Sequence, residues 1–408
     1  MRVPSLILLM MLLGSYAELR GQPQQRQSQQ KNWKQCQSND LDQSIVGCSA
    51  FIQFGREPDA KVAEAFNDRG VAYKRKGDYD HALRDFDQAL RLDPNLAKAF
   101  YDRGLIYAHT GDDDRAIQDY GHAVRLNPSL ASGFSGRGLA YLRKGDYDRA
   151  RQDFDQELQL EPNEVGAFIG RGLAYWHKGN DDRAIQDYDQ AARLRPDEAD
   201  TYYNRGLAYE SKGEHDRAIQ DYDQAVRLKP GDADSFYDRG LAYMRKGDYN
   251  RAIKDYDQAL RINATHAAAF NGRGLTYAQE GDYDRAVEDY TQALQINPAL
   301  DAAIVNRGFA YAHKGRYDLA MQDYDRALLI NPKLAEAFRG RSVACAHRGF
   351  YYQSAMDYER WLWLRHGFWG TIIRLCLIAA TLAFGFGYSY GRFRQRKYQA
   401  QSILKTSG

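Results

Sequence analysis

A repeat of 34 residues runs through most of the chain and constrains its fold more than any other feature. Eight full units follow one another without an insertion from residue 63 to residue 334. Each unit carries Gly at its eighth position, Tyr at its eleventh and Ala at its twentieth, as Gly70, Tyr73 and Ala82 do in the first unit. One such unit is too short to enclose a hydrophobic core, so its apolar residues have to be covered by the next unit. The repeat therefore predicts a stack of units with nearest-neighbour packing.

Each unit is predicted to form two helices. Phe66, Gly70 and Tyr73 are spaced by four and three residues, which places them on one face of a helix. Gly77 and Asp78 then separate the first helix from the second, because Gly accepts a left-handed turn and an acidic residue suits a helix N-terminus. The sequence thus predicts an all-α fold.

This pattern resembles the tetratricopeptide repeat family, through runs such as residues 99–107 (AFYDRGLIY) and 247–260 (GDYNRAIKDYDQAL). The sequence of the repeats is most similar to that of bacterial members. The resemblance implies a right-handed superhelical solenoid of helix-turn-helix units. A degenerate ninth unit over residues 335–366, in which Ser342 replaces the first Gly, is interpreted as a cap. Residues 33–62 are interpreted as a half-repeat that caps the other end.

The same resemblance implies where a partner binds. In the family, the second, fifth, ninth, twelfth and thirteenth residues of each unit line the inner groove of the superhelix. Aromatic side chains in such a groove are typical anchors for a peptide or a helix, although some of them could simply cover the packing. The candidate groove residues are Tyr101, Ile169, Trp176, Tyr203, Tyr237 and Met244.

The carboxylate clamp of chaperone-binding family members is missing from the first two units. Its slots hold Asn67 and Val71 in the first unit, and Tyr101 and Leu105 in the second. This difference argues against capture of a free acidic C-terminus in the way those members achieve it.

An Arg precedes the first Gly in all nine copies, and an Asp follows that Arg sixteen residues later. Arg can present a fork of donors to a carboxylate and lay its stem over an aromatic ring. A residue needed once for chemistry would not be copied nine times, so we predict a ladder of structural ion pairs. Its members include Arg69 with Asp85, Arg103 with Asp119, and Arg205 with Asp221.

The third unit departs from this regular pattern. Arg151 and Glu157 stand where the other full units have an apolar residue and Ala. Two charges on a packing face need partners or exposure. Our hypothesis is a softened stack or a contact patch near residues 150–160.

Two cysteines precede the array of repeats. Cys36 and Cys48 are expected on facing helices, and in an exported protein they would oxidise to a disulfide that staples the N-terminal cap. A reactive thiol pair or a zinc site is the alternative, but no His or Cys partners have metal-ligand spacing.

The two ends of the chain suggest export and a membrane anchor. Residues 1–17 have the pattern of a signal peptide, and residues 18–32 read as a Gln-rich linker. Residues 368–390 approach the length of a transmembrane helix, and the basic residues 391–408 would stay cytoplasmic. A hydrophobic capping helix is the alternative for the apolar segment. The prediction is a single-pass protein of the cytoplasmic (inner) membrane, with its repeats facing the periplasm or exterior.

The sequence indicates a binding protein rather than an enzyme. The net charge of +2 gives no electrostatic footprint for nucleic acid, and no phosphate loop, HExxH motif or nucleophile elbow occurs, so no cofactor is expected. No metal site is expected either, and His109, His177, His313 and His347 simply share one slot of the repeat. We predict a membrane-anchored scaffold that binds a protein or peptide and organises an envelope complex. The alternatives are a self-associating structural element, a cell-wall polysaccharide-associated assembly factor, and a cytosolic chaperone.

Overall fold

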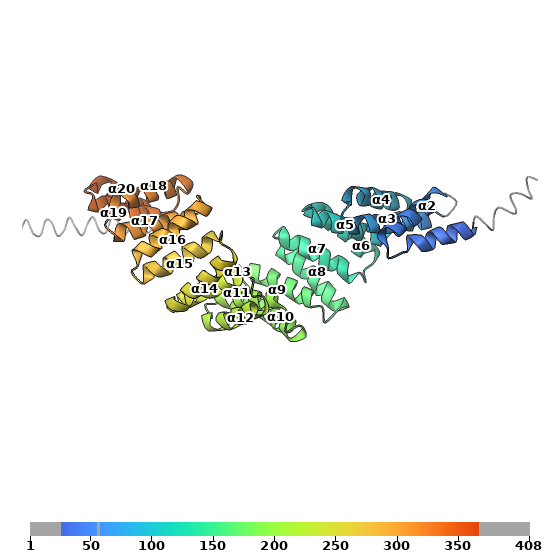
Figure 1. Ribbon diagram of the computed structural model, residues 1–408, viewed down its shortest axis with the longest axis horizontal. Coiled ribbons are helices and arrows are strands. Elements are labelled where there is room, and N and C mark those ends of the chain that lie inside the picture. Colours follow the sequence, from blue (N-terminus) through green and yellow to red (C-terminus); the bar gives the residue numbers. More distant parts are fainter. Residues whose placement is uncertain (1–25, 55–57, 367–408) are drawn as a thin grey trace, which may run out of the picture. The chain divides into compact units, whose positions relative to one another are not determined.

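The structure is a computed structural model that describes residues 26–54 and 58–366. The regular structure in these ranges is helical, and no strand occurs within them. Figure 1 shows the helices following one another in antiparallel pairs. The predicted all-α repeat fold is therefore confirmed. Packing divides the chain after Glu214 into two units.

The first unit contains a helix over residues 26–36 and ten further helices. These are α2 (Leu41–Gln53), α3 (Asp59–Arg75), α4 (Tyr79–Leu92), α5 (Ala97–His109), α6 (Asp113–Leu126), α7 (Ala131–Arg143), α8 (Tyr147–Leu160), α9 (Val165–His177), α10 (Asp181–Leu194) and α11 (Ala199–Ser211). The described part of the second unit contains nine helices, up to residue 366. These are α12 (His215–Leu228), α13 (Ala233–Arg245), α14 (Tyr249–Ile262), α15 (Ala267–Gln279), α16 (Tyr283–Ile296), α17 (Asp301–His313), α18 (Tyr317–Ile330), α19 (Ala335–His347) and α20 (Tyr351–His366).

Odd-numbered helices from α3 to α19 are the first helices of the repeats, and even-numbered helices from α4 to α20 are the second. A glycine in the left-handed region follows each first helix, as at Gly77 with φ +78°. A side chain with a Cβ would be strained there. The next residue, Asp78, accepts a hydrogen bond from the backbone N–H of His81 at 3.2 Å and so caps the second helix. The glycine and the acid together fix this helical hairpin, and Asp112, Asp146, Asp248 and Asp282 cap their second helices in the same way.

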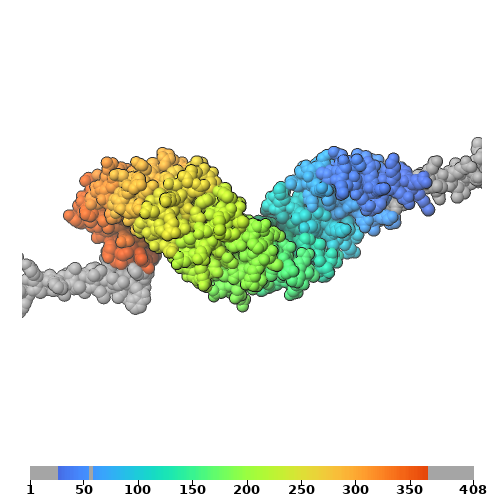
Figure 2. Space-filling view, turned by 60° about the horizontal axis from the view of Figure 1, so that its bottom comes forward, coloured from blue at the N-terminus to red at the C-terminus, as the bar shows by residue number. Residues whose placement is uncertain are grey.

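The hydrophobic core is a series of small clusters between neighbouring helices. In one of them, Ala82 and Phe86 of α4 are fully buried against Ala99 and Ile106 of α5. Gly70 of α3 is required beside this cluster, because a Cβ there would lie 2.8 Å from Cε1 of Phe86. In each unit, segments adjacent in sequence lie side by side in the space-filling view (Figure 2). Cohesion within each unit is therefore between neighbours, as expected for a solenoid.

The N-terminal end is helical earlier than the sequence suggested. Residues 26–32, which we expected in a linker, belong to the helix over residues 26–36. This helix is held in place by a small core, in which the rings of Trp33 and Phe51 lie 5.0 Å apart. The Gln-rich composition alone did not reveal that these residues lead into Trp33, which packs against Phe51.

The structure contradicts the predicted membrane localisation. Across residues 26–54 and 58–366, no helix combines the length and the apolar character needed to cross a bilayer. A single-pass inner-membrane protein with its repeats facing the exterior therefore has no structural support. The predicted signal peptide, residues 1–17, the predicted transmembrane segment, residues 368–390, and the basic tail, residues 391–408, lie outside the described residues.

Candidate partner-binding surface

We use the term first-helix surface for the positions that the family resemblance assigns to the groove, namely the second, fifth, ninth, twelfth and thirteenth of each repeat. The six predicted groove residues lie on four first helices, and all six are half-buried. They are Tyr101 on α5, Ile169 and Trp176 on α9, Tyr203 on α11, and Tyr237 and Met244 on α13.

The buried parts of these side chains take part in packing. The ring centroid of Tyr101 lies 5.9 Å from that of Tyr120, and the centroid of Tyr237 lies 5.9 Å from that of Tyr256. Ile169 packs against the core cluster that contains Tyr188. The structure thus distributes the predicted residues along the first helices and does not gather them into one compact site.

A pocket of about 630 Å³ opens on the first-helix surface of the second unit, between α17 and α19 and above α18. Sequence reasoning missed its charged residues, Glu336 and Arg339. A usable signal was present, because Arg339 occupies a fifth position that is uncharged in the eight full units. The lining residues are Phe309, Ala312, His313, Tyr317, Tyr324, Glu336, Arg339, Gly340, Val343 and His347.

The repeated histidines stack on tyrosines of the preceding repeat. The ring of His177 lies 4.7 Å from that of Tyr147, with an interplanar angle of 7°, and His347 lies 4.4 Å from Tyr317. His313 stacks on Tyr283 in the same way, whereas the ring of His109 lies 5.0 Å from that of Tyr79 at a tilt of 57°. The shared slot therefore has a packing explanation. In the described part of the chain, no group of three or more His, Cys, Asp or Glu side chains could hold a metal ion.

The arginines that precede the first Gly form paired hydrogen bonds with the acids sixteen residues later. In eight repeats, Nε donates to one carboxylate oxygen at 2.7–2.9 Å and Nη2 donates to the other at 2.6–2.7 Å. The pairs are Arg69–Asp85, Arg103–Asp119, Arg137–Asp153, Arg171–Asp187, Arg239–Asp255, Arg273–Asp289, Arg307–Asp323 and Arg341–Asp357.

The guanidinium groups of the ladder also contact aromatic rings and compensate the charge of a buried carboxylate. That of Arg69 lies 5.3 Å from the centroid of the Phe66 ring, and that of Arg103 lies 5.6 Å from Phe100. The hydrogen bond to Asp119 raises the pKa of Arg103 above its ordinary value. The Asp partners are almost fully buried, so removing the cation would leave a buried carboxylate without compensation.

In most repeats the third guanidinium nitrogen, Nη1, links the repeat to the preceding one. Nη1 of Arg103 donates to Asp87 at 2.6 Å, and Nη1 of Arg205 donates to Asp189 at 2.6 Å. The predicted partner of Arg205, Asp221, belongs to the second unit, so that pair stays a prediction. The same bond to the preceding repeat is made by Arg171 to Asp155, Arg239 to Asp223, Arg273 to Asp257, and Arg341 to Asp325.

Family profiles described as tetratricopeptide repeat match much of the chain. One matches residues 136–199 and 237–301, a second matches 63–96, 199–232 and 302–334, and a third matches 86–118. A profile described as TPR repeat matches residues 104–145. Together these profiles account for residues 63–334 apart from 233–236, about two thirds of the chain. The chain belongs to the tetratricopeptide repeat family.

Solved structures show the same fold. A tetratricopeptide repeat protein from Parabacteroides merdae ATCC 43184 is 17% identical, with a TM-score of 0.50, over 61% of this chain and 98% of that chain. A chain of the APC/C hetero-tetramer Cut9–Hcn1 is 14% identical, with a TM-score of 0.50, over 81% of this chain and 82% of that chain. YrrB, described as a TPR protein with an unusual peptide-binding site, is 24% identical over 45% of this chain and 95% of that chain, with a TM-score of 0.38. No functionally curated protein matches the chain.

The third tetratricopeptide repeat contains the irregular charges that the sequence singled out. Arg151 donates to Asp155 at 2.6 Å, so its charge is paired on the surface of α8. Glu157 is only 4% exposed, and its Oε2 has no hydrogen-bond partner in the structure. Burial raises the pKa of Glu157 to about 7, opposed by a hydrogen bond with Ser135. A pocket of about 680 Å³, lined by Arg137, Arg151 and Arg171 among others, lies beside these residues.

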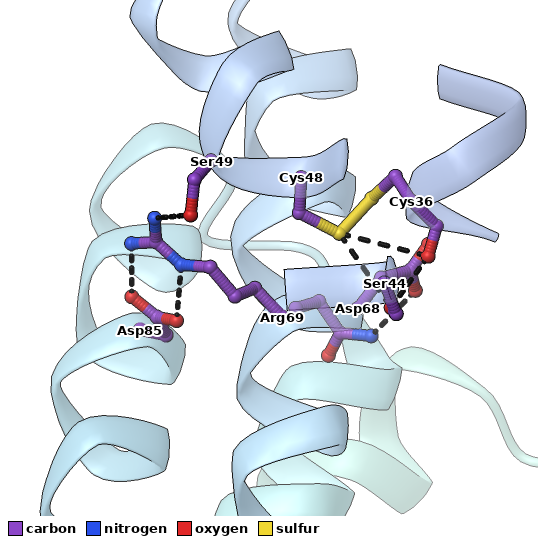
Figure 3. Close-up of a disulfide and its surroundings, with 8 residues drawn as sticks. Cys36, Ser44, Cys48, Ser49, Asp68, Arg69 and Asp85 are labelled. Carbon is purple, nitrogen blue, oxygen red and sulfur yellow. Dashed lines mark hydrogen bonds and ion pairs between the residues drawn. A yellow bond between two sulfur atoms is a disulfide. The ribbon is translucent and has the colours of Figure 1, made fainter. Parts of the chain in front are cut away.

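The N-terminal cap contains a disulfide between Cys36 and Cys48 (Figure 3). Both cysteines are buried, and the hydroxyl of Ser44 donates to the carbonyl oxygen of Cys36 at 2.6 Å. Nearby, Arg69 donates to Ser49 as well as to Asp85, which joins the cap to the first repeat. The cap is therefore connected both covalently and through the first arginine of the ladder.

Proposed function

We propose that this tetratricopeptide repeat protein is a non-enzymatic scaffold that binds a protein or peptide partner in the groove lined by its first-helix surface. The observation that carries the proposal is the half-burial of large apolar side chains at repeated groove positions. Tyr101, Trp176 and Tyr237 each have one part anchored in the packing and another part accessible to a partner. Such side chains are held rigidly, so they lose little conformational entropy when a partner binds.

Exposed apolar surface on the first helices supports the same proposal. Leu139 on α7 is 45% exposed, and Val343 on α19 is 50% exposed. Both occupy the ninth position of their repeats. The pocket between α17 and α19 adds a concave element with apolar and polar groups, which is typical of ligand sites.

The proposal does not include an envelope complex. That part of the prediction depended on a membrane anchor, and no helix over residues 26–54 and 58–366 has the length and apolar character to cross a bilayer. The Cut9–Hcn1 hetero-tetramer shows only that a chain of this fold can be part of a protein assembly. The chemistry of the peptides that bind the chain is therefore used to identify the kind of partner.

The experiment is a selection of peptides from a random displayed library on the full-length protein, followed by affinity measurement by fluorescence anisotropy. We expect the double variant Tyr101→Ala/Trp176→Ala to lower the affinity of the peptides that bind the first unit by at least about tenfold, because aromatic anchors dominate such interfaces. The matched control, Leu126→Ala/Leu194→Ala, removes exposed apolar side chains from second helices and should leave affinity unchanged. Circular dichroism checks that both variants remain folded.

Two outcomes would contradict the proposal. One is a selection that yields no peptide with a dissociation constant below about 100 μM, which corresponds to a binding free energy of only about −5.5 kcal/mol. The other is equal affinity for the wild type and the aromatic double variant together with a loss in the second-helix control. The second result would place binding on the opposite helices.

A further inference from the structure

One arginine of the ladder lacks its link to the preceding repeat. In six repeats Nη1 of the ladder arginine donates to an Asp on the preceding second helix at 2.5–2.7 Å. Arg69 and Arg307 donate from Nη1 to a hydroxyl instead. The position that faces Nη1 of Arg137 is Gly121 of α6, which has no side chain. Among the described residues, Arg137 forms hydrogen bonds only through Nε and Nη2.

Packing does not require a glycine at residue 121. The residue lies in the interior of α6, where glycine stabilises a helix less than Ala does. A Cβ there would lie 3.5 Å from Nη1 of Arg137, which is ordinary contact, and no other described residue outside the local turns of α6 comes within 4 Å. We call this space between Gly121 and Nη1 of Arg137 the open rung. A departure from the repeat that packing does not explain is expected at functional sites.

The donor in the open rung is both fixed and accessible. Nε and Nη2 of Arg137 donate to the two oxygens of Asp153 at 2.8 and 2.7 Å, and the guanidinium lies 5.7 Å from the centroid of the Phe134 ring. These contacts hold Nη1 in place. The side chain of Arg137 is 22% exposed, and Asp87, which fills the equivalent place beside Arg103, is 46% exposed. The open rung therefore lies at the surface.

Arg137 also borders the pocket of about 680 Å³ beside α8, which contains the second irregular cation of this repeat. Arg151 replaces an apolar residue and lines the pocket. Its Nη1 donates to Asp155, whereas its Nε and Nη2 have no acceptor in the described part of the chain. Exposed amide side chains of Gln152 and Gln156 line the same pocket. Unused donors are thus present on both sides of the Arg137 guanidinium.

The charge around Arg137 fits one carboxylate. The three arginines that line the pocket donate to three different aspartates, so their charges are balanced. One further carboxylate would give Arg137 the two acidic partners that Arg103 already has. A phosphate dianion would add more negative charge than any position of the ladder holds. The open rung therefore suits a carboxylate side chain better than a phosphate group.

We propose that the open rung binds an acidic side chain, Asp or Glu, of a partner protein, whose carboxylate takes the place of the side chain missing at residue 121. The carboxylate accepts a charge-assisted hydrogen bond from Nη1 of Arg137. The adjoining segment of the partner lies over the neighbouring pocket, where Arg151 and the two glutamines offer donors to its backbone carbonyl groups. This surface is separate from the first-helix surface, so the inference goes beyond the proposed function and does not depend on it.

The test uses the full-length protein and peptides selected on it from a random displayed library. Each peptide family that enriches Asp or Glu at one position is synthesised with an amidated C-terminus, once with Glu and once with Gln at that position. By fluorescence anisotropy, we expect the Gln peptide to bind the wild type at least about fivefold more weakly. Gly121→Asp should weaken the Glu peptide by at least as much, because its own carboxylate occupies Nη1 of Arg137.

Two variants serve as controls. Thr291→Asp adds the same charge at the same repeat position, beside Arg307, and should leave the affinity of the Glu peptide unchanged. Gly121→Ala adds a methyl group but no acid, so the preference for Glu over Gln should remain. Thermal unfolding checks that all three variants stay folded.

Several outcomes would overturn the inference. They are equal affinity of every Glu peptide for the wild type and Gly121→Asp, equal affinity of the Glu and Gln peptides, and a selection without any acidic peptide. Displacement of the Glu peptide by micromolar inorganic phosphate would overturn the assignment to a carboxylate. Self-association that Gly121→Asp abolishes would overturn the assignment to a different protein. None of these results contradicts the proposed function, which is tested by Tyr101→Ala/Trp176→Ala.

Discussion

Glu157 departs from the repeat pattern at a buried position. The other full repeats have Ala at this position, and in the third repeat a carboxylate is buried there instead. Ser135 interacts with the carboxyl group of Glu157, but Oε2 has no partner. A buried acid with incomplete hydrogen bonding favours its neutral form. The residue therefore makes this part of the first unit sensitive to pH.

We predict that Glu157→Ala stabilises the protein at pH 8 and has a smaller effect at pH 5. The pKa of Glu157 is raised to about 7 in the folded state from an ordinary value of 4.5, so the folded state binds the proton more tightly than the unfolded state. The stability that the folded state gains from this tighter proton binding is fully present below about pH 4.5 and is lost as the pH rises through about 7. The expected gain in the free energy of unfolding at pH 8 is on the order of 2 kcal/mol. Urea unfolding at the two pH values measures it.

Two controls separate the charge from the shape of this side chain. Glu157→Gln keeps the size and removes the titration, so it should abolish the pH dependence attributable to residue 157. Glu161→Ala removes an exposed carboxylate at the end of the same helix, which contributes to the raised pKa of Glu157, and should stabilise the protein at pH 8 far less than Glu157→Ala does. A stability gain from Glu157→Ala that is equal at pH 5 and pH 8 would contradict the assignment.

At the scale of helices, the arginine ladder joins each first helix to two second helices. Arg103 on α5 donates to Asp119 on α6 within its own repeat and to Asp87 on α4 in the preceding repeat. One side chain thereby fixes both the hairpin and the stacking of hairpins. The ladder is interrupted at Arg137, because the preceding second helix, α6, has Gly121 where the other repeats have Asp or Thr.

We predict that Gly121→Asp completes this rung and stabilises the first unit. A Cβ at residue 121 would lie 3.5 Å from Nη1 of Arg137, which is ordinary contact, so the side chain fits without strain. The expected gain in the free energy of unfolding is about 1 kcal/mol, from better helix propensity and a partly exposed ion pair. Chemical denaturation at low salt measures it.

Gly121→Asn is the control for this substitution, because it has a similar shape and helix propensity without the charge. The difference between the Asp and Asn variants should be about 0.5 kcal/mol and should shrink in 1 M salt. Equal stability of the two variants at low salt would show that Arg137 gains nothing from the added carboxylate.

At the scale of the whole molecule, stability is a sum of repeats and of interfaces between neighbours. The 34-residue register has no insertion over the eight full units, so a whole repeat can be removed without changing how its neighbours meet. In the second unit, deletion of residues 267–300 would bring α14 next to α17. Asp257 would then replace Thr291 as the group that faces Nη1 of Arg307.

We predict that the protein lacking residues 267–300 folds with helical content reduced in proportion to its length. Its denaturant dependence should also fall, because less surface is exposed on unfolding. Deletion of residues 267–283, half of this repeat, is the control, since it removes a first helix and places two second helices in succession. Circular dichroism and urea unfolding compare the two proteins. Cooperative folding of the half-repeat deletion with undiminished helicity would contradict the nearest-neighbour description.

The groove residues could be located from the sequence only as positions in a repeat. Tyr101 and Tyr237 lie on first helices as the spacing indicated, but their contacts with Tyr120 and Tyr256 depend on how closely two helices approach. That approach is set by small residues on the neighbouring helix and has no local signature. For the same reason, the pocket around Tyr324 was not anticipated.

The sequence by itself determined the two helices of each repeat, the glycine turn between them and the sixteen-residue spacing of each Arg and its Asp. These depend on local spacing, on Gly at the turns and on periodic burial, which are all readable in one dimension. Only the tertiary structure decided that Nη1 of Arg103 bonds Asp87, that Oε2 of Glu157 lacks a partner, and that Gly340 packs directly against the ring of Tyr324. The reason is that these features depend on distances of a few ångströms between helices. A repeat pattern fixes which residues recur, whereas packing fixes which of their atoms meet.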